Sequence, residues 1–270
     1  MYSNTAFHDI WGVIDPDEPD DPEDPEGFAT IVFMVENEQG EEITDAAITF
    51  DGQAFDPGFY IFDNVIPEAH IRYTLDGSPP DGNSQLYEEP LLIHDRAGDP
   101  NVISLIPTNN ISPGHPYNEH WQPPAGEIQK INSIRAAAFI GPETSSRVKT
   151  KSYLIDGHGT DRYSMPVISI NAHAGAFFEP DSGIYVHGNH VNYSQRGREW
   201  ERLVHFEFYE SHGSLAFAQE MGTRIHGGTS RNRPRKSLRM YARDDYGTTW
   251  VDYYLFPDKN IERYKRFLLR

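Results

Sequence analysis

Short apolar runs separated by turn residues cover most of this 270-residue chain, and helical periodicity is almost missing. Seven runs rich in β-branched and aromatic residues precede residue 156, with glycine, proline and aspartate between them. They are residues 31–35, 46–50, 59–62, 71–75, 91–93, 134–140 and 148–155. Short strands joined by turns are typical of a β-sandwich, because each strand buries one face against a second sheet. The chain is therefore expected to be mainly β, with an all-β sandwich in its first part.

An acidic, proline-rich segment precedes all of these runs. Residues 15–27 contain four prolines and eight carboxylates. Carboxylates repel one another and offer nothing to bury, so the segment predicts a disordered tail or linker over residues 1–27. It lacks the glycine-turned loop spacing of a calcium-binding hand, and no metal site is predicted there. The sandwich is expected to occupy residues 28–157.

The composition excludes several kinds of protein. The chain is 37% hydrophobic and 13% aromatic, which is enough apolar material for two folded domains. It has no cysteine, so disulfides, thiolate zinc sites and a cysteine nucleophile are excluded. No segment reaches the roughly 18 uninterrupted apolar residues of a membrane helix, and no span is expected. The first residues also lack the pattern of a secretory signal peptide.

Four segments of the expected sandwich share their pattern with a known domain type: residues 71–80, 87–90, 134–139 and 146–148. They resemble the chitobiase/hexosaminidase C-terminal type of immunoglobulin-like domain, over residues 55–155 with an insertion at 101–129. The resemblance implies a fibronectin-like sandwich that accompanies extracellular enzymes and adhesins and carries no catalytic residues. Residues 31–48 also resemble the start of a carboxypeptidase regulatory-like repeat, so residues 28–54 are expected to add strands of that kind.

The charge changes sign along the chain. Residues 1–192 carry a net charge of −23, whereas residues 193–270 carry +5. Within the second part, the 23 residues 221–243 hold seven Arg or Lys and no carboxylate. A soluble surface mixes its signs, so this concentration predicts a site for an anion, with phosphate as the natural candidate. No nucleic-acid partner is expected, because the acidic first part would repel a phosphate backbone.

A glycine pair and a lysine give this basic segment its expected geometry. Gly227 and Gly228 begin a turn that lets backbone N–H groups approach a ligand closely. Lys236 then opens a strand on its apolar face, where it either extends to solvent or enters a cleft and meets a phosphate or carboxylate. The residues expected to bind the anion are Lys236, Gly227, Gly228, Thr229, Ser230, Arg224 and Arg239, with Arg231 as a further candidate. The alternative is a solvated basic hairpin without a ligand.

Eight motifs in the last 106 residues occur in an order found in one family. They are residues 165–170, 183–186, 198–202, 222–231, 236–239, 246–247, 255–257 and 267–270. Together they resemble the spore-coat CotH family of atypical protein kinases. The resemblance implies an α+β kinase-like domain whose β-rich first half is residues 160–270. It also implies a secreted or surface enzyme that transfers phosphate from ATP to the serines of surface or coat proteins.

The same resemblance implies what this chain lacks. The catalytic and Mg²⁺-binding carboxylates of that family lie beyond the strand matched by residues 267–270, so no catalytic or metal-binding residue is expected here. ATP is the expected cofactor, and Mg²⁺ is expected only in the complete domain. His187, His190 and His226 lack the spacing of metal ligands. Arg198, Glu199 and Arg202 are expected to form a structural ion-pair cluster.

A second interpretation makes the chain a non-catalytic surface or coat protein, or a carbohydrate-binding adhesion module. Tyr87, Tyr117 and Trp121 would then stack on sugars from the sandwich. A plain spacer is the simpler alternative for the sandwich. The kinase and adhesion interpretations both place the protein outside the cell or at its surface.

Overall fold

The computed structural model divides the chain into two compact units. Unit 1 comprises residues 1–96 and 130–157, and unit 2 comprises residues 97–129 and 158–270. The structure describes residues 9–14, 28–36, 42–43, 48–50, 53–55, 69–88, 91–109, 119–140, 142–144, 147–155 and 163–270. The described residues form several antiparallel sheets and one short α-helix, which confirms the expected mainly β fold class.

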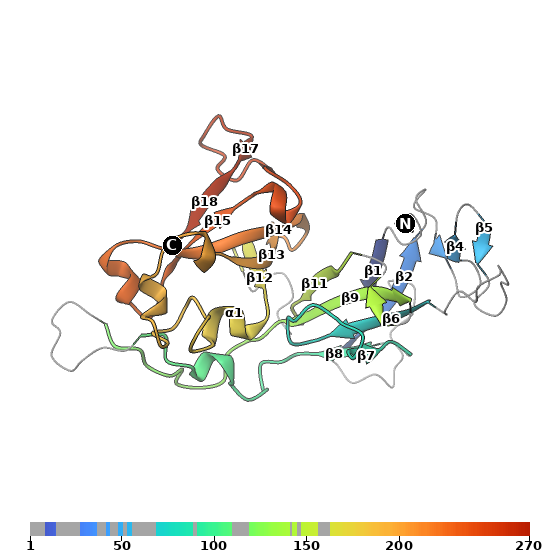
Figure 1. The fold of residues 1–270 in the computed structure, drawn as a ribbon, viewed down its shortest axis with the longest axis horizontal. Helices are drawn as coiled ribbons and strands as arrows, with labels where there is room; N and C mark the ends of the chain where they lie inside the picture. The colour runs from blue at the N-terminus through green and yellow to red at the C-terminus, as the bar shows by residue number, and fades with distance from the viewer. Residues whose placement is uncertain are drawn as a thin grey trace. The chain divides into compact units, whose positions relative to one another are not determined.

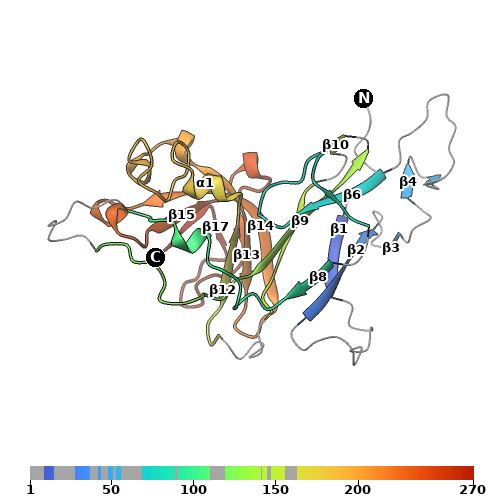
Figure 2. The same ribbon diagram turned by 90° about the horizontal axis from the view of Figure 1, so that it is seen from below.

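Unit 1 contains two sheets and a small hairpin. In the first sheet, β1 (Asp9–Ile14), β2 (Phe28–Glu36) and β3 (Glu42–Ile43) lie in that order, and β8 (Leu91–His94) also pairs with β2. The second has the order β10 (Glu143–Thr144), β9 (Asn132–Ile140), β6 (Ala69–Thr74) and β7 (Gln85–Leu86), with β11 (Lys149–Tyr153) also on β9. The hairpin joins β4 (Ile48–Phe50) to β5 (Gln53–Phe55). Figure 2 labels most of these strands.

The core of unit 1 forms where the sequence places its apolar runs. Ile93, Ile134 and Tyr153 are buried together, from β8, β9 and β11. Most of the expected runs overlap observed strands, although residues 59–62 lie outside the described part. Residues 9–14 differ from the expected disordered tail, because their backbone pairs with β2 as β1. The acidic residues 15–27 lie outside the described part.

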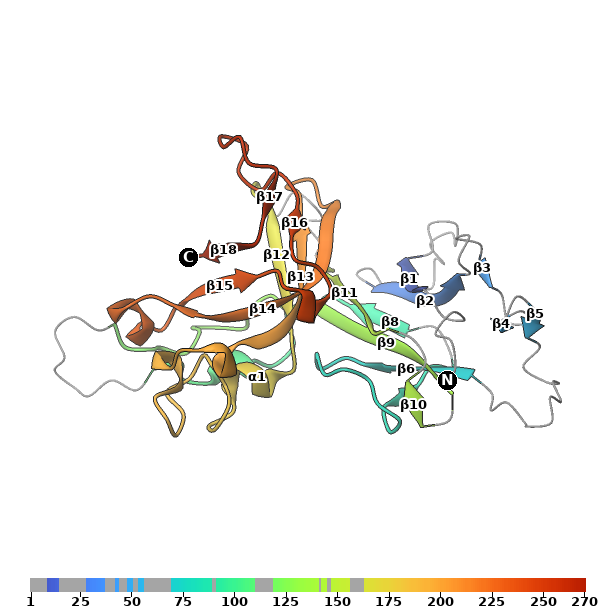
Figure 3. The same ribbon diagram turned by 45° about the horizontal axis from the view of Figure 1, so that its top comes forward.

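Unit 2 is built on a five-stranded antiparallel sheet (Figure 1). Its order is β12 (Val167–Asn171), β13 (Arg202–Tyr209), β14 (Leu215–His226), β15 (Ser237–Tyr241) and β18 (Arg266–Leu269). A hairpin of β16 (Val251–Asp252) and β17 (Arg263–Tyr264) projects beyond this sheet (Figure 3). The helical segments are α1 (Ala174–Phe178), η1 (Ile103–Leu105), η3 (Asn192–Ser194), η4 (Arg198–Trp200), η5 (Thr229–Asn232) and η6 (Asp244–Tyr246).

Alternation along these strands separates an apolar face from a basic one. Phe206, Met221, Met240 and Phe267 come from four neighbouring strands and share one buried cluster. Side chains one position away on a strand point to the opposite face, because the side-chain period is two residues. That opposite face carries Arg224 on β14 and Arg239 on β15. The five-stranded sheet therefore presents positive charge on the side away from its core.

The insertion after β8 belongs to unit 2. Asn109 is buried, and its amide group donates to the backbone oxygens of Glu119 (2.9 Å) and Asn232 (2.8 Å). Its side-chain oxygen accepts from the backbone N–H of Trp121 at 3.1 Å. Figure 1 shows the segment in green, running beneath α1. The expected boundary between residues 28–157 and 160–270 therefore differs from the observed one, because residues 97–129 hydrogen-bond to unit 2.

Two short segments of unit 2 have local structures that their sequences do not indicate. Asn171 ends β12, and its side-chain amide donates to Glu207 at 3.1 Å. Residues 184–186 form turns, in which the N–H groups of Ile184 and Tyr185 donate to the carbonyl oxygens of Ala176 and Phe177 in α1. The carbonyl oxygens of α1 satisfy these two N–H groups, so the backbone there needs no strand partner. None of the helices in the described ranges is long and apolar enough to cross a membrane.

Candidate anion-binding site

A glycine turn links β14 to β15 and positions the basic residues. Gly227 has φ +129°, in the left-handed region, and a side chain there would collide with the hydroxyl of Ser230. Gly228 precedes η5, and an added side chain there would meet open space. The expected turn of residues 227–230 is therefore present, with η5 starting at Thr229. Gly228 and Thr229 are exposed, so backbone at the turn is accessible to a ligand.

Arg231 holds this turn in place. Its Nε donates to the backbone oxygen of Gly227 at 2.7 Å, and a terminal nitrogen donates to those of Tyr193 and Gln195, each at 2.9 Å. Arg231 is only 8% exposed, and burial is the main cause that lowers its pKa. Three carbonyl acceptors satisfy the guanidinium without neutralising its charge. Arg231 thus organises the turn and adds a buried positive charge beneath it.

Two further arginines lie opposite each other on neighbouring strands. Arg224 on β14 is the direct register partner of Arg239 on β15. Like charges opposite each other destabilise an antiparallel pair. Arg224 donates to the hydroxyl of Tyr241 (2.6 Å) and to the backbone oxygen of Gly197 (3.0 Å), so its position is well defined. The two positive charges repel each other, and a bound anion would reduce this repulsion.

The electrostatics of His226 show how strongly this positive charge is concentrated. A terminal nitrogen of Arg239 lies 3.4 Å from Nε2 of His226. The pKa of His226 is lowered, first by burial and then by Arg239, Arg231, Arg270 and Arg224. Arg196 acts in the same way on Arg231. We refer to Arg196, Arg224, Arg231, Arg239 and Arg270 as the arginine cluster.

Among the described residues, the arginine cluster has no carboxylate counter-ion. None of its five guanidiniums forms an ion pair with a carboxylate anywhere in the described part of the chain. The other arginines of unit 2 show the contrast, since Arg243 pairs with Glu201 and Arg263 pairs with Asp252. Clustered charge without a partner raises the free energy of the protein and attracts anions. Positive charge is therefore concentrated around Arg224 and Arg239, and the anion site expected there stays a prediction.

Lys236 takes neither of the positions that the sequence suggested. It lies on the core side of β15 and is 7% exposed, so it does not extend to solvent. Its ammonium donates to the backbone oxygens of Thr108 (2.7 Å) and Arg233 (2.6 Å). It also lies 4.6 Å from the ring centroid of Tyr193. Burial lowers its pKa from 10.5 to about 7.

This placement separates Lys236 from the arginine cluster. The ammonium group fastens the segment 97–129 to the start of β15 rather than facing an open anion site. Arg239 projects from the opposite face of the same strand, beside Arg224 on β14. The seven expected ligands therefore divide into two groups: the turn residues with Arg224 and Arg239, and Lys236 on the other side.

Sequence reasoning missed a carboxylate that organises the edge of the site. Glu201 is buried and accepts from Arg243 twice, at 2.8 and 3.1 Å, and from the hydroxyl of Tyr246 at 2.9 Å. The hydrogen bond to Glu201 is the main cause that raises the pKa of Arg243. Gly222 packs against this carboxylate, where any side chain would collide with it. The only sequence signal is the mixed charge of residues 198–202, which gives no indication of its partner.

The expected cluster of Arg198, Glu199 and Arg202 has a different set of partners. Arg198 pairs with Asp245. Arg202 donates to the backbone oxygens of Ser182 and Glu199 and lies 5.5 Å from the ring of Trp200. These residues are structural, as expected, but they act through backbone carbonyls and a distant aspartate.

The three histidines considered as metal ligands contact three different groups. His187 contacts the backbone oxygen of Gly188, His190 lies 3.8 Å from Asp181, and His226 lies beside Arg239. Among the residues that the structure describes, no group of three His, Asp or Glu is arranged to hold a metal ion.

Comparison with known proteins concerns mainly unit 1. A family model described as Fn3 associated matches residues 61–153, in agreement with the expected immunoglobulin-like or fibronectin-like domain. The match covers about a third of the chain and includes the insertion that packs on unit 2. No curated protein and no solved structure matches the chain.

Proposed function

We propose that unit 2 binds the phosphate groups of ATP at the arginine cluster, as part of a CotH-like secreted or surface protein kinase that phosphorylates protein serine. The observation that carries the proposal is the concentration of Arg224, Arg231 and Arg239 beside the Gly227–Gly228 turn, with no carboxylate partner in the part of the chain that the structure describes. Guanidiniums bind phosphate oxygens through short, charge-assisted hydrogen bonds, often in pairs. A triphosphate brings several negative charges to a surface that has several unpaired positive ones.

The chemistry of phosphoryl transfer explains why such a site is useful. Its catalysis depends mainly on positioning the phosphates and stabilising their charge, and protein kinases use a glycine-rich loop and basic residues for this purpose. The turn at residues 227–230 supplies the loop, and the arginines supply the charge. Mg²⁺ and the carboxylates that hold it belong to the complete domain that we propose. Serine-containing surface or coat proteins are the proposed acceptors.

Lys236 has an indirect role in this proposal. Its ammonium is occupied by two carbonyl oxygens, so the direct phosphate ligands are the arginines and the backbone of the turn. By fixing the strand that follows the turn, Lys236 positions Arg239 three residues later. The sequence-based assignment of Lys236 as a phosphate ligand stays a prediction.

Calorimetric titration of the 270-residue chain with ATP, ADP and inorganic tripolyphosphate tests the site. We expect tripolyphosphate and ATP to bind, and Arg239→Gln to weaken both by at least about tenfold, since a charged hydrogen bond contributes about 1.5–3 kcal/mol. Arg263→Gln is the matched control, because it removes the same charge from an exposed pair with Asp252. It should change the affinity less than about twofold.

Two results would contradict the proposal. One is the absence of saturable binding by both ATP and tripolyphosphate at low salt, where electrostatic attraction is strongest. The other is an equal loss of affinity in Arg239→Gln and Arg263→Gln, which would show a general effect of net charge. Binding of tripolyphosphate without any preference for ATP would support the phosphate site and contradict the nucleotide assignment.

A further inference from the structure

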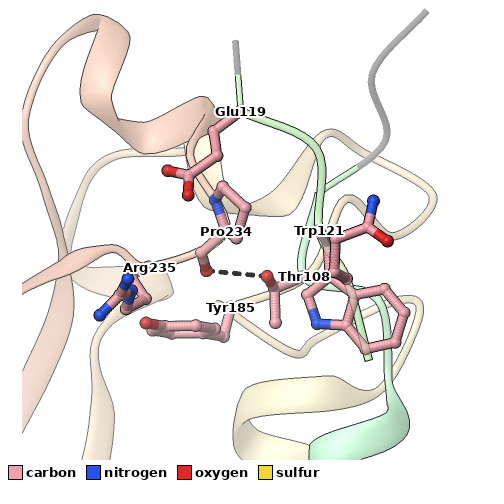
Figure 4. Close-up of a pocket in the computed structure, with 7 residues that line it drawn as sticks. Thr108, Glu119, Trp121, Tyr185, Pro234 and Arg235 are labelled. Carbon is pink, nitrogen blue, oxygen red and sulfur yellow. Dashed lines mark hydrogen bonds between the residues drawn. The ribbon is translucent and has the colours of Figure 1, made fainter. Parts of the chain in front are cut away.

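A pocket of unit 2 is lined by residues that do not belong to the arginine cluster. Its volume is about 390 Å³, near the lower end of the range of ligand pockets. Figure 4 shows the residues that line it: Thr108, Glu119, Trp121, Gln122, Tyr185, Pro234 and Arg235. They come from the insertion, from the loop after α1 and from the segment before β15, three parts that are distant in sequence.

The walls of this pocket are held by hydrogen bonds that leave its functional groups free. The hydroxyl of Tyr185 accepts from the backbone N–H of Lys236 at 2.9 Å, and the hydroxyl of Thr108 donates to the backbone oxygen of Pro234 at 2.7 Å. Asn109 fixes the backbone on both sides of the 119–121 segment. Such a preformed site loses little conformational entropy when a ligand binds.

The polar groups on the rim match a neutral ligand. Glu119, Gln122 and Arg235 are exposed, and none of their side chains is bonded to another described residue. Together they supply hydrogen-bond acceptors and donors, while the charges of Glu119 and Arg235 oppose each other. A phosphate would be repelled by Glu119 and an ammonium ion by Arg235. An uncharged ligand with many hydroxyl groups can donate hydrogen bonds to Glu119 and accept them from Arg235.

The apolar groups add a flat surface for a ring. The indole of Trp121 is half-buried, and its N–H makes no hydrogen bond to any residue in the described ranges. Figure 4 shows this nitrogen on the side of the ring that faces Tyr185. An indole offers a broad apolar face and one polar edge, which suits the C–H face and the hydroxyl edge of a pyranose.

The backbone of the pocket disfavours a peptide. The carbonyl oxygen of Pro234 already accepts from Thr108, and that of Thr108 accepts from the ammonium of Lys236. An extended peptide would need unpaired backbone groups of this kind to form strand-like hydrogen bonds. The groups available to bind a ligand are therefore side-chain polar groups and ring faces, which are the groups that recognise sugars.

We propose that this pocket binds a neutral sugar residue, with Trp121 as the stacking platform and Glu119, Gln122 and Arg235 as partners of its hydroxyl groups. The site differs from the sequence-based expectation of a sugar-binding sandwich. Tyr87 lies in unit 1 and Trp121 in unit 2, while Tyr117 lies outside the described residues. The proposal does not depend on phosphate binding, since it uses none of the arginine cluster.

Saturation-transfer NMR and calorimetry with three neutral trisaccharides test the proposal: tri-N-acetylchitotriose, cellotriose and mannotriose. We expect saturable binding of at least one of them to the 270-residue chain. Trp121→Ala should weaken this binding by roughly tenfold or more, because it removes the stacking platform. Glu119→Gln replaces an exposed side chain by one of the same shape, so it should weaken sugar binding measurably without affecting the fold.

Trp250→Ala is the matched control for the indole. Trp250 is also half-buried, but it lies between Arg263 and Lys265 at the projecting hairpin, so its removal should leave sugar affinity unchanged. The proposal is wrong if none of the three sugars binds, or if Trp121→Ala and Glu119→Gln both retain full affinity. Loss of binding in Tyr87→Ala instead would place the site in unit 1 and would also overturn the proposal.

Discussion

Replacing Glu201 by alanine is expected to destabilise unit 2 by about 3 kcal/mol, because a buried charge partner is lost. The carboxylate receives three hydrogen bonds, two from Arg243 and one from Tyr246. The side chain of Glu201 is fully buried, whereas that of Arg243 is 32% exposed. Alanine leaves the guanidinium and the phenol without their acceptor, and partial exposure of Arg243 keeps the cost near the lower end of the range for buried pairs.

Hydrogen exchange of peptides from β13, β14 and β15 measures this change within the complete chain, together with urea unfolding. The matched control is Asp252→Ala, which breaks an ion pair of the same 2.8 Å length between two exposed side chains. The control should cost less than about 1 kcal/mol, since exposed pairs contribute little. Equal protection of the β13, β14 and β15 amides from exchange in the two variants would show that Glu201 does not stabilise the sheet more than an exposed ion pair does.

The stability of unit 2 is expected to rise with pH in the alkaline range because of Lys236. Burial lowers the pKa of this lysine from 10.5 to about 7 in the folded protein. Between these two values the unfolded chain binds a proton that the folded chain has released, so unfolding becomes less favourable as pH rises. The effect is at most about 1.4 kcal/mol per pH unit, and amounts to about 3 kcal/mol from pH 7 to pH 9.5. Below about pH 7 both states are protonated and this contribution disappears.

Comparison with Lys236→Met isolates the effect. Methionine retains the length of the side chain but cannot titrate, and every other titrating group is common to both proteins. The difference in unfolding free energy, wild type minus variant, should therefore increase with pH across this range in urea titrations. Lys265→Met, at an exposed lysine, should give a profile parallel to that of the wild type. A difference that stays flat, or that falls with pH, would contradict the lowered pKa of the buried lysine.

Much of the strand pattern was predictable because it is local. Residues 134–140 and 204–209 are recognisable as strands from their composition and alternation, and β9 and β13 form there. The same alternation correctly predicts that Leu238 and Met240 share the core face of β15. The ends of strands were less predictable: asparagine often caps a helix, but the side chain of Asn171 at the end of β12 bonds to Glu207 instead.

The candidate site was predictable in composition and only partly in geometry. The density of Arg and Lys in residues 221–243 indicated an anion site, and Gly227 indicated its turn. Burial of Arg231 beneath that turn depends on carbonyls of residues 193 and 195, more than 30 positions away. The partners of Glu201 are similarly distant along the chain. Such contacts leave no periodic trace in the sequence around either partner.

The sequence by itself determined that the protein is mainly β, where most strands lie, which side of β15 is apolar, and where positive charge is concentrated. Only the tertiary structure decided that residues 97–129 belong to unit 2, that Lys236 bonds to Thr108, and that several arginines lie close to His226. Local pattern follows from the geometry of one strand, which repeats every two residues. A partner 128 residues away is selected by packing and by hydrogen-bond satisfaction, and these are properties of the whole folded unit.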